Sequence, residues 1–424
     1  MKTMVELLQK HPQVSDYKIN IHQKESYELF FVKGKLETVR CTDTCDKEVT
    51  VYVNHDGFKG DAQFFVYPST TAQQMETLLE EAVCKALLIN NKNYELPANE
   101  QGEFVVESNF ADYEPADLAA KIAKIVFEAN KIPNAALNSV EVFVNRHTQS
   151  VQNSRGLCKS QVSYDAMVEA IPTYNGALQS VELYEQYNFG ALDEAVLAAE
   201  IAEKMEQVKA RYEAVKPEAA LDCPVILNKD ELSTLFGNLV GDMNYSTVYS
   251  KSNLFQKGDA FQKEPQGDRI GITMVGEVPG CMYSARFDAD GMSLGSIRVA
   301  EDGKVVNYYG SNRFGQYLGE TPTGNLRCMV VDAGSAPAEE FGHGPYLEIV
   351  SMSGLQVDLN NDYIGGEIRL AYYHDGEKRS PVTGISISGA LSEVFRHIRL
   401  SADVGIYNRY VGPEKALLKG LNIF

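Results

Sequence analysis

The sequence predicts an α+β protein built from two domains. At 424 residues the chain is too long for one ordinary hydrophobic core, and two domains of about 200 residues are expected. The first half alternates strand-like and helical segments in two passes of one pattern, whereas the second half is a series of short apolar runs separated by glycine. We therefore expect an N-terminal α/β domain of repeated hairpin–helix units, residues 1–218, and a β-rich C-terminal domain, residues 219–424, with a barrel-like or sandwich-like form.

The first pass of the pattern begins close to the N-terminus. Residues 17–33 alternate as two strands, with a turn at 24–26 between them. Residues 49–67 form a hairpin around Asp56-Gly57, because this dipeptide readily adopts the positive φ angles of a tight turn. Apolar residues at helical spacing then predict a helix from about residue 71 to residue 88.

The second pass repeats this order. A helix over residues 115–130 leads into two long strands that turn near 153–156. A third strand, 178–187, precedes a helix over 192–214. Lys216-Pro217 follows, and because proline cannot continue a helix, we place the domain boundary near residue 218.

The second half begins with a short buried strand (223–228) and a helix (229–241). Short apolar segments separated by glycine then predict strands at 270–274, 281–287, 294–299, 304–309, 326–332, 346–358, 366–374 and 381–388. Two short helical pieces, 337–341 and 389–397, interrupt this series.

Composition argues against several classes of function. The net charge of −19, without a cluster of Lys and Arg, argues against nucleic-acid binding, since phosphates must be met by basic side chains. No stretch approaches the ~18 apolar residues of a membrane span, and the N-terminus lacks the features of a secretory signal. The seven cysteines are scattered and lack metal-ligand spacing. We expect a cytoplasmic protein with reduced thiols.

Familiar catalytic motifs are missing from the sequence. It contains no P-loop, nucleophile elbow or dinucleotide-binding glycine fingerprint. The run EEFGH places Glu339 and Glu340 close to His343, but one imidazole with carboxylates is a poor zinc site. A metal site formed by these residues is one alternative, and a solvated helix end followed by a glycine turn is the other.

The order of several longer segments resembles one known family. These segments are VKGKLETVR and VTVYVNHDGFKG near the start, VQNSRGL in the middle, and then ARFDADGMSLGSIRVAEDGKVVNYYGSNRFGQYLGETPTGN and LEIVSMSGLQVDLNNDYIGGEIRLAYYHDGEKRSPVTGISISGALSEVFRHI. In order and spacing they are similar to the TldD/PmbA family of peptidases, also called modulators of DNA gyrase, over nearly the whole chain. The resemblance implies an N-terminal α/β domain and a β-rich C-terminal domain, in agreement with the division near residue 218.

The resemblance also implies a kind of subunit. TldD-type members carry H-E-x-x-x-H on a helix early in the C-terminal domain, with a distant cysteine completing a metal site. TldE (PmbA) members lack these ligands and pair with a TldD-type chain. Here the corresponding helix reads KDELSTLFGNLVGDMNYS, and Leu235, Phe236 and Val240 stand about where the histidines would fall. Glu231 remains at its start, where a carboxylate usually just complements the helix dipole.

The sequence thus resembles the TldE type. We expect no catalytic residue, metal ligand or cofactor in this chain, with zinc held by a TldD-type partner subunit.

The segment YYGSNRFGQYLGETPTGN, residues 308–325, is the candidate binding element. Its glycines predict a loop in which the backbone turns through positive φ or lets another backbone approach closely. Such a loop could receive an extended peptide as an added strand. The residues expected to bind the peptide, through open backbone or side-chain hydrogen bonds, are Gly310, Asn312, Arg313, Gly315 and Asn325. The alternative is that the loop packs against a neighbouring strand or a partner subunit.

These observations lead to one functional hypothesis and two alternatives. The hypothesis is a cytoplasmic, TldE/PmbA-like subunit of a TldD/TldE-type metallopeptidase that acts on small unfolded peptides and is a homodimer when alone. The first alternative is a stand-alone peptide-binding or interaction protein, also a homodimer, with no peptidase activity. The second is an active peptidase that uses Glu339, Glu340 and His343 as unrecognised ligands. Four aromatic residues after the helix are expected to be exposed and to serve the dimer interface: Tyr245, Tyr249, Phe255 and Phe261.

Overall fold

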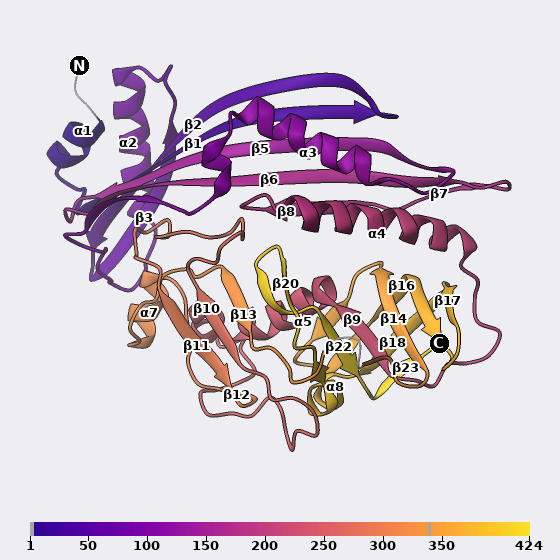
Figure 1. The fold of residues 1–424 in the computed structure, drawn as a ribbon. Helices are drawn as coiled ribbons and strands as arrows, with labels where there is room; N and C mark the ends of the chain where they lie inside the picture. Colours follow the sequence, from indigo (N-terminus) through magenta and orange to yellow (C-terminus); the bar gives the residue numbers. More distant parts are fainter. Residues whose placement is uncertain (1–3, 338–340) are drawn as a thin grey trace.

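One long, curled sheet organises the first half of the chain, as the computed structural model of residues 4–337 and 341–424 shows (Figure 1). Its strands are β1 Asp16–Val32, β2 Lys35–His55, β3 Phe58–Val66, β4 Gln101–Val105, β5 Ala135–Asn153, β6 Cys158–Asn175, β7 Ser180–Glu182 and β8 Glu185–Phe189. They are arranged in the order β3-β2-β1-β5-β6-β4, and β7 and β8 both pair with β6. Because β1 lies beside β5, the two hairpin units predicted from the sequence join into one sheet.

The predicted turn at residues 24–26 is wrong. β1 continues through this region, and Lys24 lies opposite Thr44 of β2 on one side and His147 of β5 on the other. The chain turns instead at Lys33 and Gly34, both of which have positive φ angles. The polar run at 22–26 is compatible with a strand because its side chains alternate across the sheet.

The other main elements of the first half are confirmed. Asp56 and Gly57, both with positive φ, join β2 to β3. The helices are α1 Met4–Lys10, α2 Ala72–Ala86, α3 Pro115–Ala129 and α4 Glu194–Glu213, with a short 3-10 helix, η1, at Asn109–Asp112. α2 begins at a capping box, in which Thr71 and Gln74 satisfy each other's backbone N–H groups. The predicted strand at 178–187 is two short strands, β7 and β8, and the short helix α1 was not predicted.

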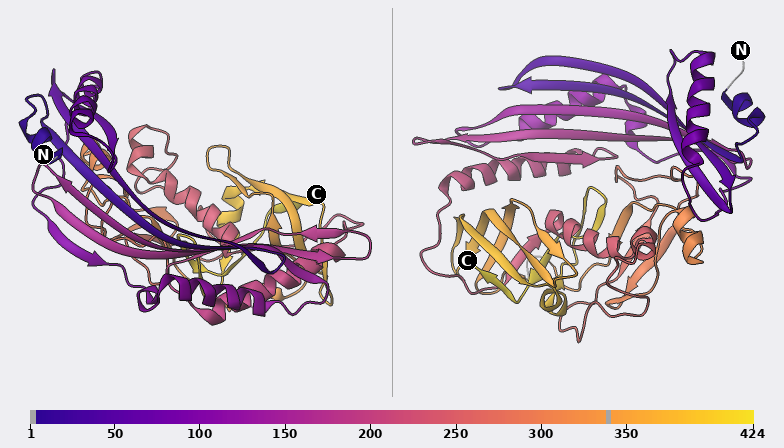
Figure 2. Two further views of the ribbon diagram at one scale, coloured as in Figure 1. Left: turned by 90° about the horizontal axis from the view of Figure 1, so that it is seen from above. Right: turned by 180° about the vertical axis from the view of Figure 1, so that it is seen from behind.

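Two helices, α3 and α4, cover one face of the long sheet. Leu118 and Ile122 of α3 and Ile201 and Met205 of α4 are almost fully buried in a single apolar cluster with residues of β5 and β6. Seen from above, the long strands curve together with α3 and α4 along one side (Figure 2). α4 also faces the second half of the chain, where Ala210 packs with residues of β14 and β16.

The second half is β-rich, as predicted. Its strands are β9 Val225–Asn228, β10 Ile272–Val275, β11 Ser296–Glu301, β12 Lys304–Val305, β13 Cys328–Val331, β14 Tyr346–Met352, β15 Gln356–Asp358, β16 Tyr363–His374, β17 Arg379–Val382, β18 Ile385–Ala390, β19 Arg399–Leu400, β20 Val404–Tyr407, β21 Tyr410–Pro413, β22 Lys415–Leu418 and β23 Leu421–Ile423. One sheet has the order β12-β11-β10-β13-β21-β20, and the other β19-β22-β9-β14-β16-β18-β23, with β15 and β17 beside β16. The helices are α5 Lys229–Asp242, α6 Tyr245–Tyr249, α7 Asn312–Leu318 and α8 Leu391–His397.

One core serves both sheets of the second half. Leu235, Phe236 and Leu239 of α5 are fully buried in it, together with apolar side chains of β9, β10, β13, β14 and β16. Strands of the two halves of the chain do not mix in any of these sheets. The predicted boundary near residue 218 lies in the connection between α4 and β9.

Several predictions in the second half are wrong. Residues 281–287 form turns instead of a strand, and the predicted loop at 308–325 contains the helix α7. The predicted helical piece at 337–341 falls largely on residues 338–340, outside the described residues. The strands between residues 399 and 423 were not predicted, because they are too short to carry a clear alternating pattern.

Candidate functional site

The segment around α7 has a different local structure from the predicted loop. Ser311 caps the helix by accepting a hydrogen bond from the Phe314 backbone N–H, and Gly319 ends it in the left-handed conformation, with φ of 73°. Serine and glycine at these positions are signals for a short helix. The density of glycine around them concealed that signal in the sequence.

α7 holds an extended segment of the first half of the chain, residues 91–95. The Asn312 side-chain amide donates to the backbone carbonyl of Glu95 at 2.7 Å. Gln316 donates to the same carbonyl at 2.8 Å and accepts from the Glu95 N–H at 2.9 Å. The Tyr317 hydroxyl donates to the Lys92 carbonyl at 2.7 Å. These bonds join segments more than two hundred positions apart in the sequence.

Arg313 also takes part in the contact between α7 and the first half of the chain. Its guanidinium donates to the Asn91 side chain at 2.5 Å and lies 3.7 Å from an Asp61 carboxylate oxygen. It also lies over the ring of Tyr94, 5.7 Å from the centroid, which is a favourable cation–π position. Arg313 is therefore a residue that joins α7 to the first half of the chain.

The two glycines of the predicted site leave little space around them. A Cβ at Gly310 would lie 3.1 Å from Tyr245, and the backbone there has a φ of +149°. A Cβ at Gly315 would lie 3.1 Å from Pro322 and 3.2 Å from Tyr245. Glycine here permits close packing on Tyr245, which is 2% exposed.

The structure thus brings the five predicted peptide-binding residues into one region. Gly310, Asn312, Arg313 and Gly315 belong to α7 or its approach. Asn325 lies beside them because its neighbour Gly324 forms an antiparallel bridge with Gly310, and the Asn325 backbone N–H donates to Asp288 at 2.8 Å. These contacts favour the alternative in which the segment packs against another part of the chain. Peptide binding by these residues stays a prediction.

The aromatic residues after α5 are less exposed than predicted. Tyr245 and Phe261 are buried, at 2% and 4% exposure, and Tyr249 and Phe255 are half-buried. Tyr249 packs against Phe314 and Tyr317 of α7. These side chains contribute to the core and to the packing around α7, so the predicted exposed patch is wrong.

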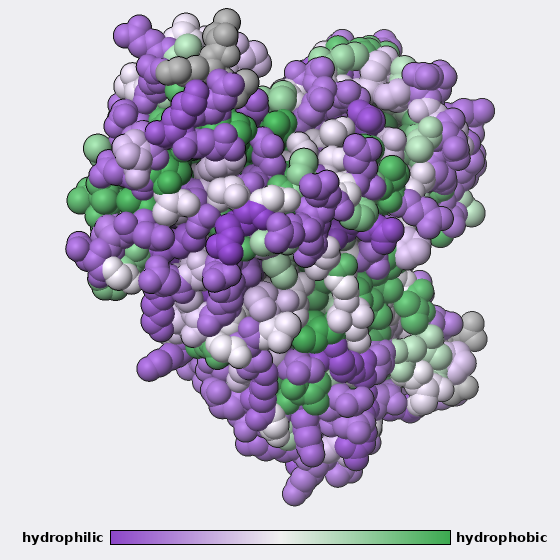
Figure 3. Space-filling view, turned by 90° about the vertical axis from the view of Figure 1, so that its left-hand side faces the viewer, coloured by the Kyte–Doolittle hydropathy of each residue, from purple (hydrophilic) through white to green (hydrophobic). Residues whose placement is uncertain are grey.

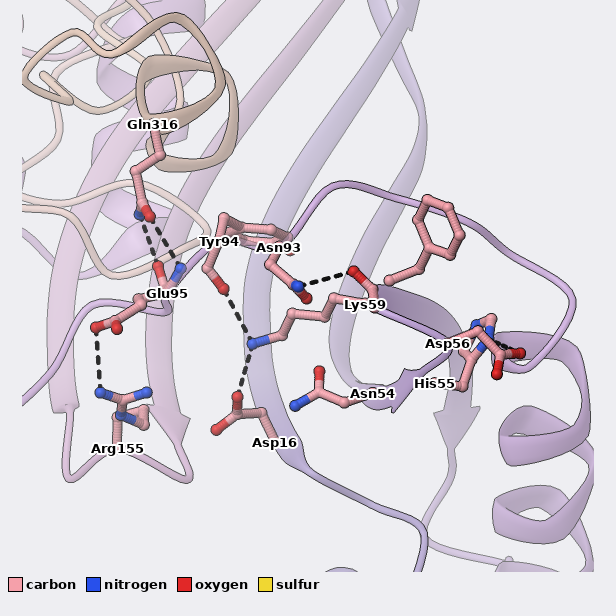
Figure 4. A pocket seen from close by; sticks show the side chains of 12 residues that line it. Asp16, Asn54, His55, Asp56, Lys59, Asn93, Tyr94, Glu95, Arg155 and Gln316 are labelled. Carbon is pink, nitrogen blue, oxygen red and sulfur yellow. Dashed lines mark hydrogen bonds and ion pairs between the residues drawn. The ribbon is translucent and has the colours of Figure 1, made fainter.

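A polar pocket lies beside this contact (Figure 4). Its volume is about 570 Å³. Side chains from the first half of the chain form most of its wall, and Gln316 of α7 completes it. The lining residues are Asp16, Asn54, His55, Asp56, Gly57, Phe58, Lys59, Asn93, Tyr94, Glu95, Arg155 and Gln316. No sequence pattern indicates this pocket, because its residues come from five separate segments.

Charges in the pocket are largely compensated. The Lys59 ammonium donates to Asp16 at 2.7 Å and to the Tyr94 carbonyl at 3.1 Å, and Asp16 also accepts from the Ser154 hydroxyl at 2.6 Å. At the rim, Arg155 pairs with Glu95 at 3.3 Å. Burial raises the pKa of the Tyr94 hydroxyl, which keeps it neutral at physiological pH. The pocket suits a polar ligand of low net charge.

The surface at this end of the molecule is mainly hydrophilic (Figure 3). Hydrophobic residues gather there in separate small groups. Exposed apolar side chains of β3, of the residue that follows it and of the segment after α2 include Phe65, Tyr67, Leu88 and Ile89.

α5 is the helix on which the family resemblance places a metal motif in catalytic members. Leu235 and Phe236 are 0% exposed and Val240 is 3% exposed, all within the apolar core. None of these side chains can donate an electron pair to zinc. In residues 4–337 and 341–424, no group of three or more His, Cys, Asp or Glu side chains is placed to hold a metal ion. Glu339 and Glu340 lie outside the described residues, and His343 is exposed. The described residues therefore do not fit a zinc site on α5.

Glu231, at the start of α5, is more than a charge that complements the helix dipole. It is 6% exposed, and its Oε2 atom has no hydrogen-bond partner among the described residues. Burial and the neighbouring Asp230 raise the pKa of the Glu231 carboxyl well above its usual range. Folding therefore favours the protonated form of this carboxyl group.

Comparison with known proteins identifies a matching family model, related sequences and a similar solved structure. Residues 221–423 match the family model of the PmbA/TldA metallopeptidase C-terminal domain. A metalloprotease of Synechocystis sp. is 22% identical over 459 aligned positions, which cover 99% of this chain and 94% of that protein. The metalloprotease PmbA of Escherichia coli O157:H7 is 25% identical over 188 positions, or 42% of this chain and 41% of that protein. The crystal structure of TldE from Thermococcus kodakarensis superposes with a TM-score of 0.79 at 15% identity, covering 97% of both chains.

The second half of the chain, residues 221–423, thus matches a PmbA/TldA metallopeptidase C-terminal domain. The chain as a whole has the fold of TldE and is similar in sequence to metalloproteases of the TldD/PmbA family. None of the helices within residues 4–337 and 341–424 combines the length and apolar character needed to span a bilayer.

Proposed function

We propose that this chain is a TldE/PmbA-type subunit that carries no metal itself and works with a TldD-type partner. The partner would hold zinc, and the pair would cleave small unfolded peptides in the cytoplasm. The similarity to this family supports the peptidase context. The choice of subunit type rests on the apolar side chains of α5 at the positions of the metal motif.

The apolar filling of α5 is the observation that carries this proposal. Leu235, Phe236 and Val240 are buried in the core of the second half. Imidazoles at these positions would have to be buried and hydrogen-bonded within an apolar cluster, at a cost of several kcal/mol. α5 is therefore built as a core helix, and activation of water by a metal is left to the partner.

Reconstitution tests the proposal. The purified chain should contain no stoichiometric transition metal and should not cleave an unfolded peptide. Addition of a TldD-type subunit should give a stable complex that cleaves the peptide and is inactivated by a chelator. About one tightly held metal ion per chain, with cleavage by the chain alone, would contradict it.

A second candidate function is peptide binding without any peptidase partner. The polar pocket beside α7 favours it, because amide and carboxylate groups line the pocket and could hydrogen-bond to a peptide backbone. In this case the chain would bind an unfolded peptide alone, as a homodimer, and would not associate with a TldD-type subunit. Light scattering and peptide titration, with and without that subunit, separate the two functions.

A further inference from the structure

Two cysteine thiols meet inside the second half of the chain. The Sγ atoms of Cys281 and Cys328 lie 3.4 Å apart, and the two residues are 4% and 0% exposed. Cys281 lies in the turns that follow β10, and Cys328 is the first residue of the neighbouring strand β13. The other cysteines of the chain are exposed or half-buried: Cys41, Cys45, Cys84, Cys158 and Cys223. Cys281 and Cys328 differ from these cysteines because both are buried and their sulfur atoms contact each other.

The surroundings make the two sulfurs chemically unequal. A hydrogen bond from the Cys328 thiol, assisted by the backbone N–H groups of Tyr283 and Ser284, lowers the pKa of Cys281 although burial opposes this. The same contact with Cys281, together with burial, raises the pKa of Cys328. Because the thiolate is the reactive form of cysteine, Cys281 is the nucleophile of the pair. Cys328 keeps its proton and is placed to react second.

The pair also lies where the two halves of the chain meet. The Gly190 N–H, just after β8, donates to the Gly280 carbonyl at 2.8 Å, beside Cys281. The Cys281 thiol donates to the backbone carbonyl of Asn408 at 3.1 Å, and the Asn408 side chain accepts from Asn188 at 2.9 Å. A change at Cys281 therefore reaches two contacts between the halves.

We propose that Cys281 and Cys328 form a site of reversible oxidation, at which a hydroperoxide converts the two thiols into a disulfide. A hydroperoxide is the class of oxidant that suits this site, because a thiolate cleaves its O–O bond directly and becomes a sulfenic acid. The Cys281 thiolate attacks the peroxide oxygen, which gives a sulfenic acid and releases hydroxide or alkoxide. The Cys328 sulfur then attacks the Cys281 sulfur and forms the S–S bond. The hydroxyl group leaves and takes the Cys328 proton as water.

Oxidation would change both contacts that surround the pair. The disulfide removes the S–H donor of the Asn408 carbonyl, because the Cys281 sulfur no longer carries a proton. It also ties the turn beside Gly190 to the start of β13 and closes a loop of the chain, which restricts the unfolded state. We expect faster amide hydrogen exchange at residues 404–409 and a higher melting temperature in the oxidised protein.

The experiment uses the full chain with its exposed cysteines replaced, so that intermolecular disulfides do not interfere. The substitutions are Cys41→Ser, Cys45→Ser, Cys84→Ser and Cys158→Ser. The folded protein is treated with stoichiometric hydrogen peroxide, unfolded, alkylated and digested for mass spectrometry. We expect the peptides that contain Cys281 and Cys328 to be joined, with a loss of two hydrogen atoms, and to separate again with dithiothreitol.

Two further variants make the result specific. With Cys328→Ala, the disulfide should be lost and a dimedone adduct should appear on Cys281, because the sulfenic acid has no second thiol to react with. With Cys223→Ala, the joined peptides should form as in the parent. If Cys328→Ala does not fold, Cys328→Ser replaces it, since a hydroxyl cannot form the disulfide. Full alkylation of both thiols after peroxide treatment of the folded protein would overturn the proposal, as would a dimedone adduct on Cys223 instead of Cys281.

Discussion

The Asn312 side-chain amide donates a 2.7 Å hydrogen bond to the backbone carbonyl of Glu95, a residue 217 positions earlier in the chain. Asn312 is only 4% exposed, so the donor side of this part-buried bond is shielded from water. Gln316, one turn further along α7, donates to the same carbonyl. One face of a seven-residue helix thereby holds an extended segment of the first half against the second.

Asn312→Ala should destabilise the protein by about 0.5–1.5 kcal/mol, because it removes one hydrogen bond from a carbonyl that still accepts from Gln316. Chemical denaturation of the variant and the parent measures this difference. Asn238→Ala is the matched control, since Asn238 is exposed and bonds only within α5. If Asn238→Ala lost as much stability as Asn312→Ala, the Asn312–Glu95 hydrogen bond would not be the cause of the loss.

Arg313→Ala and Gly315→Val separate peptide binding from internal packing. Arg313→Ala should cost about 1–2 kcal/mol, since its partly exposed guanidinium bonds to Asn91 and stacks on Tyr94. Gly315→Val should cost about 1–3 kcal/mol by overpacking against Pro322 and Tyr245. Melting temperature and peptide cleavage by the reconstituted two-subunit complex are both measured. Cleavage that falls while the melting temperature and assembly stay unchanged would support peptide binding.

Glu348 should stabilise the protein more at neutral pH than in acid. Its carboxylate pairs with Lys415 at 2.7 Å and Arg379 at 2.8 Å. Burial alone would raise the pKa of Glu348, but the two cations outweigh it and lower the pKa below its usual value of 4.5. A lowered folded-state pKa gives stability that is present above the unfolded pKa and is lost as the pH falls through the folded value.

Glu348→Gln should therefore cost about 3 kcal/mol at pH 7, near the lower end for a buried pair because Arg379 is half-exposed. Its stability should also fall less between pH 7 and pH 3 than that of the parent. Denaturation curves at several pH values provide the measurement. An equal loss in both proteins over this range would show that Glu348 does not titrate as described.

Glu231 should have the opposite pH dependence. Its pKa is raised in the folded protein by burial and by Asp230, so folding favours the protonated acid. Stability is then lost as the pH rises from the unfolded pKa towards the folded one. Glu231→Gln, which resembles the neutral acid in shape, should keep or increase stability at pH 8. The same denaturation series tests this, and a destabilised variant at pH 8 would mean that the carboxylate form is required.

Sequence patterns predicted the elements whose signals are local. Helix periodicity located α2, α3, α4 and α5, and the Asp56-Gly57 dipeptide located the turn between β2 and β3. The wrong turn in β1 was predicted from the polar run at residues 22–26. Polar residues on a sheet face are fully compatible with a strand. The helix α7 was missed because its capping serine and glycine stand among other glycines.

Local sequence patterns could not predict the candidate site, for a different reason. Asn312 was identified as a hydrogen-bonding residue, but its partner Glu95 can be found only from the fold. Asp16, Lys59 and Arg155 meet around the pocket from separate strands and turns. Pairings of this kind depend on how the long sheet curls, which a single sequence does not encode in any short pattern.

The position of β5 beside β1 has a consequence for the time course of synthesis. β1 pairs with β2, which follows it directly, but its other edge is covered only by β5, after about 100 further residues have been made. At about 5–20 residues per second, this takes roughly 5–20 s on the ribosome. During that interval a 17-residue strand edge is bare on the nascent chain. A second nascent chain on the same messenger could pair with it, so a chaperone that covers extended segments should raise the yield of folded protein.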